Sequence, residues 1–269
     1  MSARDLLVKR LRRTRGEAMI VSRYDLLPEN PMRRLLVFLP LLLLAACSVQ
    51  QQEISVPDQV VPAAGVTGLN LDVNVGRITI LASSDGQVHL GLSLQPSTSF
   101  FGILTNSASL AAVQHAAISH VINNGVLTLG VQYPTNTDSS NIDEHWTIAL
   151  PPTLAVSSKV NVGELKVSGI AGGVDANLNV GDVRLDVPGG PLKIIANVGK
   201  IQATVRSLDY SDIVLGANIG KVDLTLDGVS TGSVQKTTTG ENLDYTLKGK
   251  NSIDLQATTG SVELALLTH

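Results

Sequence analysis

Few side chains in this 269-residue sequence are spaced for catalysis or metal binding. His115 and His120 are five residues apart, so on a helix they fall on different sides and cannot chelate as an i, i+4 pair would. The run Asp143-Glu144-His145 has the composition of a catalytic cluster, but neighbours along a strand point to opposite faces. We therefore expect neither a metal site nor a catalytic cluster at these positions.

A second set of candidates lies in the repetitive part of the sequence. Polysaccharide-cleaving β-helix enzymes use carboxylates or a basic residue gathered in a groove, and the candidates here are Asp182, Asp186, Lys200 and Lys221. Stacked repeats would instead align Glu164, Asp182, Lys200, Lys221 and Glu241 in one ladder. Exposed ion pairs in such a ladder contribute roughly 0–1 kcal/mol. We expect no enzyme, with no catalytic residues, metal or cofactor, and keep polysaccharide binding or cleavage as the alternative.

Cys47 is the one cysteine, which excludes a disulfide framework or a site with two thiolates. It follows a basic pair, Arg33 and Arg34, and the apolar run Leu35–Leu44, which at ten residues is too short to span a bilayer. The motif Leu44-Ala45-Ala46-Cys47 resembles the lipobox of bacterial lipoprotein precursors. This resemblance implies that the chain is cut between Ala46 and Cys47 and that Cys47 carries the lipid.

The resemblance also divides the chain. Residues 32–46 are the expected signal peptide, and residues 1–31 are an over-extended start or a long leading region, depending on whether translation begins at Met1 or Met32. Ser48 after the cysteine implies the outer membrane, by the sorting rule of enteric bacteria. Residues 47–65 are polar and contain two prolines, so we expect a lipidated tether before a domain over 66–269.

The charge distribution agrees with this division. Of the 20 basic and 23 acidic residues of the chain, 9 and 4 lie in residues 1–46, which leaves 11 basic and 19 acidic residues in the remainder. An acidic domain is a poor candidate for nucleic-acid binding through its overall field. We expect no nucleic-acid partner.

The remainder is dominated by internal repeats. A small or polar residue, an apolar residue and a glycine recur at intervals of 18 to 21 residues from Gly163 to Gly260, with apolar and polar residues alternating on both sides, and an earlier copy that ends at Gly76 stands apart. This alternation predicts two half-buried strands per repeat that meet at a glycine corner. The expected corners are Gly76, Gly163, Gly181, Gly199, Gly220, Gly240 and Gly260.

Stacking these repeats predicts an all-β fold, a single-stranded β-solenoid or β-roll of about six to seven two-strand rungs. Asn161, Asn179, Asn197 and Asn218 would then form one ladder of amides. The last rung, Gly260 to Leu266, would leave an open edge through which the chain could self-associate.

The first part of the domain is less regular. Its expected strands are Leu69–Leu81, Gln87–Leu94, Gly125–Gln132 and Glu144–Leu150, and 107–118 is the expected short helix. The segments Val73–Ile80 and Trp146–Pro152, with the recurring glycine corners, resemble the bacterial domain family named putative adhesin, a domain of unknown function. The resemblance implies a β-solenoid or roll and an envelope role, and it carries no catalytic residues.

These observations predict a non-enzymatic protein of the cell envelope that is lipid-anchored at the outer membrane. Its partners would be the membrane through the anchor and an envelope protein or glycan that contacts the repeating surface. Adhesion, scaffolding and partner binding all remain open, because architecture alone does not establish function.

Overall fold

The computed structural model describes residues 53–96, 112–134, 142–226, 229–230, 235–236 and 240–268. The chain divides into two units, Met1–Val49 and Gln50–His269, and all of the described residues belong to the second. Cys47 and the expected signal segment 32–46 lie outside the described residues. Within the described ranges, no helix is long and apolar enough to cross a membrane.

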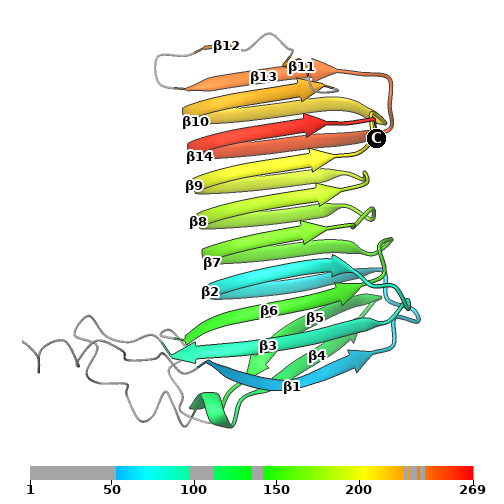
Figure 1. Ribbon diagram of the computed structural model, residues 1–269, viewed down its shortest axis with the longest axis vertical. Coiled ribbons are helices and arrows are strands. Elements are labelled where there is room, and N and C mark those ends of the chain that lie inside the picture. The colour runs from blue at the N-terminus through cyan, green and yellow to red at the C-terminus, as the bar shows by residue number, and fades with distance from the viewer. Residues whose placement is uncertain are drawn as a thin grey trace, which may run out of the picture. The chain divides into compact units, whose positions relative to one another are not determined.

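The domain is all-β, and its described strands form one mixed sheet. Parallel and antiparallel pairings both occur, with the long strands stacked one above another (Figure 1). The strands are β1 (Ile54–Val61), β2 (Gly68–Ala82), β3 (Val88–Pro96), β4 (Ala117–Asn123), β5 (Val126–Gln132), β6 (Ile142–Leu150), β7 (Ala155–Ser168), β8 (Val174–Val187), β9 (Leu192–Val205), β10 (Tyr210–Leu226), β11 (Val229–Ser230), β12 (Gln235–Lys236), β13 (Glu241–Thr246) and β14 (Asn251–Leu266).

Six long strands, β2, β7, β8, β9, β14 and β10, pair in parallel and in register; we call them the stack. Equivalent residues of neighbouring strands lie roughly 4.8 Å apart and form columns across the stack. Alternating Val, Ile, Leu and Ala side chains of these strands fill the core, so the period-two pattern of the sequence is the pattern of burial.

Each repeat is one continuous strand that turns at its glycine, whereas the sequence predicted two strands per repeat. In β7 the alternation breaks at the turn: Val160 is buried, Asn161 and Val162 are both exposed, and Leu165 is buried again. We call the half before the glycine the first wall and the half after it the second wall. Pairing with the neighbouring strand continues on both sides of the turn, because the glycine accommodates the change of direction.

The order of the strands corrects the prediction that the repeats stack in sequence order. The C-terminal strand β14 lies between β9 and β10, with Gly260 paired to Gly199 on one side and to Gly220 on the other (Figure 1). The expected open edge at Gly260–Leu266 is therefore wrong, since both edges of β14 are paired. Beyond β10 follow β13 and β12, which pair antiparallel.

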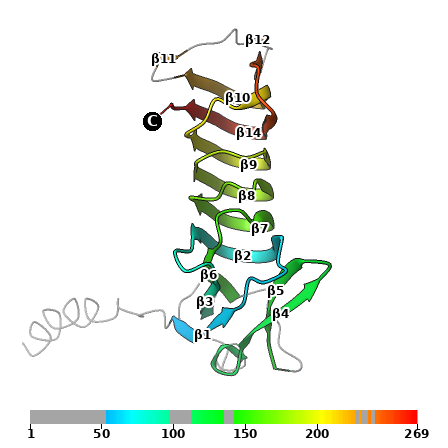
Figure 2. The same cartoon turned by 90° about the vertical axis from the view of Figure 1, so that its right-hand side faces the viewer.

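At the other end, the two walls of β2 pair with different strands of the same sheet. The first wall of β2 pairs with β5, which forms a hairpin with β4, while the second wall pairs with β6, followed by β3 and β1. Figure 2 shows the β4–β5 hairpin diverging from β1 and β3. We call these five strands the base; its core contains Trp146, which is 1% exposed.

Two predicted segments of the base are wrong. Of the expected helix 107–118, residues 107–111 lie outside the described residues, only 112–114 are helical, and Ala117 begins strand β4. Of the expected tether 47–65, residues 54–61 form β1, paired with β3. Pro57 is tolerated in β1 because the register with β3 shifts between Val56 and Gln59. Pro57 lies within this shift, where its missing N–H removes no hydrogen bond of the ladder.

Candidate functional site

The turn of each repeat is fixed by a column of glycines that contact one another through the backbone. A Cβ added to Gly181 would lie 1.7 Å from the carbonyl oxygen of Gly163, and one added to Gly163 would lie 1.7 Å from that of Gly76. The φ of Gly181 is 141°, which side chains rarely permit. Only glycine fits this column, whose described members are Gly76, Gly163, Gly181, Gly199, Gly260 and Gly220.

Gly240, the remaining expected corner, does not belong to this column. An added Cβ there would meet the carbonyl oxygens of Ala217 at 2.1 Å and Asn218 at 2.3 Å, so it packs against the start of the turn in β10. The reason is that β13, which follows it, runs antiparallel to β10 instead of continuing the stack.

Two residues before the glycines of β2, β7, β8 and β9, asparagine side chains form a hydrogen-bonded ladder on the outside of the first wall. Asn161 donates from Nδ2 to Oδ1 of Asn74 at 3.0 Å, Asn179 donates to Asn161 at 3.0 Å, and Asn197 donates to Asn179 at 2.9 Å. Asn218 does not follow Asn197, because β14 lies between their strands. Each amide in the ladder keeps a second hydrogen and a second lone pair for a partner outside the wall.

A groove runs beside this ladder and encloses about 580 Å³. Its outward side chains belong to the ladder and to the column two residues earlier in each strand. We call these two columns the Asn face: Asp72, Lys159, Asn177 and Ile195 in the outer column, and Asn74, Asn161, Asn179 and Asn197 in the ladder.

The turn also exposes a line of apolar residues next to the ladder. Val162, Val180 and Val198 are each 40% to 47% exposed, and Ile219 is 54% exposed. Exposed single valines are ordinary, but here they recur in one column and border the amide ladder. The exposed valines of β7, β8 and β9 thus lie next to the Asn face and recur at the same spacing, whereas Ile219 is separated from them by Thr259 of β14.

The second wall carries charges that neutralise one another across strands. Glu164 is paired with Arg77 at 3.3 Å, with Lys166 at 3.2 Å and with Arg184. Further along, Lys200 contacts Glu263 at 2.6 Å. Because these groups are partly exposed, each pair contributes little to stability.

The expected charge ladder is changed by the strand order. Asp182 accepts a hydrogen bond from the backbone N–H of Lys200 at 3.0 Å, but Ser261 of β14 separates Lys200 from Lys221. Glu241 lies in β13, paired to Ala217, and its carboxylate accepts from the backbone N–H of Val222 at 3.0 Å. The remaining candidate, Asp186, is held by Arg206 at 2.7 Å.

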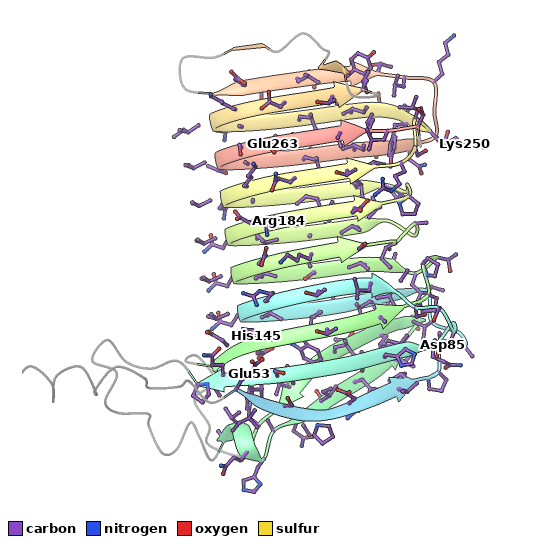
Figure 3. All side chains as sticks on the ribbon, viewed as in Figure 1. Glu53, Asp85, His145, Arg184, Lys250 and Glu263 are labelled. Atoms are coloured by element: carbon purple, nitrogen blue, oxygen red, sulfur yellow. The ribbon has the colours of Figure 1, made fainter. Side chains whose placement is uncertain are left out.

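Sequence reasoning missed a groove on the base. About 360 Å³ is enclosed over strands β1, β3 and β6, between His89, which contacts Asp85 at 2.9 Å, and His145, which contacts Glu53 at 3.3 Å. Figure 3 places Glu53 beside His145, away from Asp85. The groove was not predicted from the sequence, because residues 54–61 were assigned to a tether and not to the strand β1 that lines the groove.

A partly buried carboxylate lies beneath the glycine column. Glu144 accepts hydrogen bonds from Nε1 of Trp146 at 2.9 Å and from the hydroxyl of Tyr133 at 3.1 Å. Burial raises the pKa of Glu144 above its usual range, and the two hydrogen bonds oppose that rise. The pKa of Tyr133 is raised by burial as well and by the nearby carboxylate. The side chains of Tyr133 and Trp146 thus bind the carboxylate of Glu144, and Glu144 is paired with Gly76 of β2.

The histidines and acidic residues that the sequence analysis set aside lie as follows. His115 and His120 are exposed, on the turn before β4 and within it, and Asp143, Glu144 and His145 alternate along β6. Among the described residues, no three His, Cys, Asp or Glu side chains lie close enough to hold a metal ion.

Comparison with solved structures finds matches of low sequence identity and low TM-score. A putative cell adhesion protein from Clostridium sporogenes has a TM-score of 0.49 at 15% identity, over 80% of this chain and 100% of its own. A putative adhesin from Bacteroides fragilis has a TM-score of 0.31 at 13% identity, over 80% and 97%. One from Parabacteroides distasonis has 0.25 at 9%, over 81% and 98%. No family model and no curated protein matches the chain, and likeness at this level transfers no residue role.

Proposed function

We propose that this chain is a non-enzymatic lipoprotein of the cell envelope, and that its stack is a solenoid-type wall which binds an extended partner along the Asn face. The observation that carries the proposal is the groove beside the amide ladder, where donors and acceptors repeat at the spacing of the strands. A partner with a repeating chemistry can meet each strand in the same way, so affinity accumulates over the length of the groove.

Binding is favoured over catalysis by the state of the candidate acidic groups. Asp182 caps a backbone N–H, and Asp186 is held by an arginine. Because these two carboxylates are held by different partners on the second wall, they do not form the pair of acidic groups that would cleave a glycosidic bond. Polysaccharide binding remains the second candidate, because the amides, Lys159 and Asp72 of the Asn face suit hydroxyl groups.

The binding proposal is tested by blocking the groove without disturbing the ladder. Cells that produce the full chain, or its Asn177→Arg variant, are applied to surfaces coated with peptidoglycan or with outer-membrane fragments. Asn177 faces the groove, so the bulky guanidinium is expected to abolish retention of the cells on whichever surface binds them. Thr204→Arg on the second wall is the matched control and is expected to leave retention unchanged. Equal retention of the Asn177→Arg cells would contradict the proposal.

The lipid anchor has its own test. With globomycin, which blocks the lipoprotein signal peptidase, the tagged chain is expected to accumulate as a precursor, and Cys47→Ala is expected to remove the mature form from the membrane fraction. Mass analysis of the mature N-terminus should then find an acylated Cys47. A soluble chain that retains residues 1–46 would contradict lipid anchoring while leaving the Asn face to its separate test.

A further inference from the structure

The last strand of the chain occupies an internal position in the stack. β14 pairs in parallel with β9 on one side and with β10 on the other, although both precede it in the sequence. Its inward side chains are at most 3% exposed, so this position provides most of its apolar burial. These side chains are Ile253, Leu255, Ala257, Val262, Leu264 and Leu266.

The residues that lead into β14 pack closely against the end of the β9–β10 connection and the start of β10. A Cβ added to Gly249 would lie 2.0 Å from the backbone nitrogen of Tyr210, and the N–H of Gly249 donates to the Tyr210 carbonyl at 2.8 Å. Asn251 donates to the Asp209 carbonyl from its backbone and from its side chain, each at 3.1 Å. The crossing is thus held by a few contacts at the entrance to the strand.

The two strands that β14 separates are suited to pair with each other. Ala196-Asn197-Val198-Gly199 of β9 matches Ala217-Asn218-Ile219-Gly220 of β10 residue for residue in type. The connection 206–209 between them has four residues, like the connection 188–191 that joins the neighbouring strands β8 and β9. Direct pairing of β9 with β10 is therefore compatible with the chain when β14 is withdrawn.

Charge favours the observed order over direct pairing. With β14 in place, Ser261 separates Lys200 from Lys221, and Lys200 contacts Glu263 at 2.6 Å. Direct pairing would bring the two lysines into neighbouring positions of one column, where like charges repel. β14 therefore supplies a complementary strand to both neighbours.

A withdrawn β14 has no equivalent place in its own chain. The outer edge of β10 is already paired with β13 over Asp212–Ala217, so the strand cannot simply add beyond β10. Its apolar side chains still require burial, because exposing them to water is unfavourable. Among the described residues, the gap between β9 and β10 is the surface that matches both of its edges, and a second copy offers the same gap.

We propose that this chain self-associates by exchange of its C-terminal strand, with β14 of each copy inserted between β9 and β10 of the other. The exchanged contacts are those within a single chain, so the dimer needs no new interface chemistry. The proposal is independent of the Asn face, because the exchange uses backbone edges inside the stack.

The exchange is tested by disulfides between two differently tagged full-length chains in one cell. Both carry Cys47→Ser, so that the introduced cysteines are the only thiols. One chain carries Thr204→Cys and the other Ala265→Cys; these positions are paired between β9 and β14, within disulfide reach across neighbouring strands. After oxidation, a covalent dimer containing both tags is expected on a non-reducing gel.

The matched control replaces Thr204→Cys with Asp186→Cys, which lies one strand further from β14 and out of disulfide reach. This pair is expected to give no covalent dimer. A further variant that carries Thr204→Cys and Ala265→Cys in one chain checks the strand order, and must form an internal disulfide if the strand is in place. Internal disulfide with no two-tag dimer would overturn the exchange, as would equal dimer from the Asp186→Cys control.

Discussion

The stack and the base achieve stability in different ways. In the stack, each strand contacts its neighbours through equivalent residues, and the turn depends on glycine backbones lying against one another. In the base, antiparallel strands enclose the large ring of Trp146 and a partly buried carboxylate. The stack is therefore specified by backbone contacts that repeat from strand to strand, whereas the base depends on particular side chains that occur once.

The largest loss of stability is expected from a substitution at the glycine turn of the stack. Gly181→Ala places a Cβ 1.7 Å from the carbonyl oxygen of Gly163 at a φ of 141°, so neighbouring strands must separate. We expect a loss of roughly 3 kcal/mol or more, since strained backbone alone costs about 1–3 kcal/mol. Chemical unfolding of the purified chain measures it.

Gly189→Ala is the control for this substitution. Its Cβ would meet Ser207 at an ordinary 3.5 Å, so the unfolding midpoint should stay close to that of the unmodified chain. Equal destabilisation by both substitutions would mean that the glycine column has no special role.

A change in stability of intermediate size is expected from a substitution at the partly buried carboxylate of the base. Glu144→Gln keeps an acceptor for Trp146 and removes a charge whose pKa is raised by burial. A raised carboxyl pKa means that stability is present below the unfolded pKa and is lost as the pH rises through the folded pKa. The variant should therefore gain about 1 kcal/mol at pH 7 and little at pH 4. Thermal unfolding at both pH values decides, and a loss at pH 7 would show that the carboxylate is required in its charged form.

The smallest expected effect concerns one ion pair of the stack. A hydrogen bond from Lys200 holds the pKa of Glu263 below its usual range. A lowered pKa contributes stability above the unfolded pKa, and this contribution is lost as the pH falls through the folded pKa. Glu263→Gln should cost at most about 1 kcal/mol at pH 7, because both partners are more than a third exposed, and this cost should shrink as the pH falls through the lowered pKa of Glu263. A pH-independent cost would indicate packing instead of charge.

Local patterns predicted the strands of the stack but not their order. Alternation and corner glycines located β7, β8 and β9 closely, because both depend on neighbours in sequence. The position of β14 could not be predicted in this way, since Gly199, Gly220 and Gly260 sit in equivalent patterns and any two of these strands could pair. The amide ladder was therefore predicted as far as Asn197 and failed at Asn218.

In the base, one available signal was overlooked. Asn124 and Gly125 have φ values of 50° and 80°, which is the two-residue hairpin turn that Asn-Gly favours, and this turn joins β4 to β5. Reading it would have replaced part of the expected helix by a strand. The contact of Glu144 with Tyr133 and Trp146 had no comparable sequence signal, because it depends on how β6 packs beneath β2.

The place of β14 has a consequence for how the chain is made. β14 follows both of its neighbours in the sequence, so it is synthesised after them, and yet it lies between them. The pairing of the stack is therefore complete only after β14 has been added between β9 and β10. Loss of residues 251–266 would consequently remove a strand from within the stack, and β9 and β10 would each lose a paired neighbour.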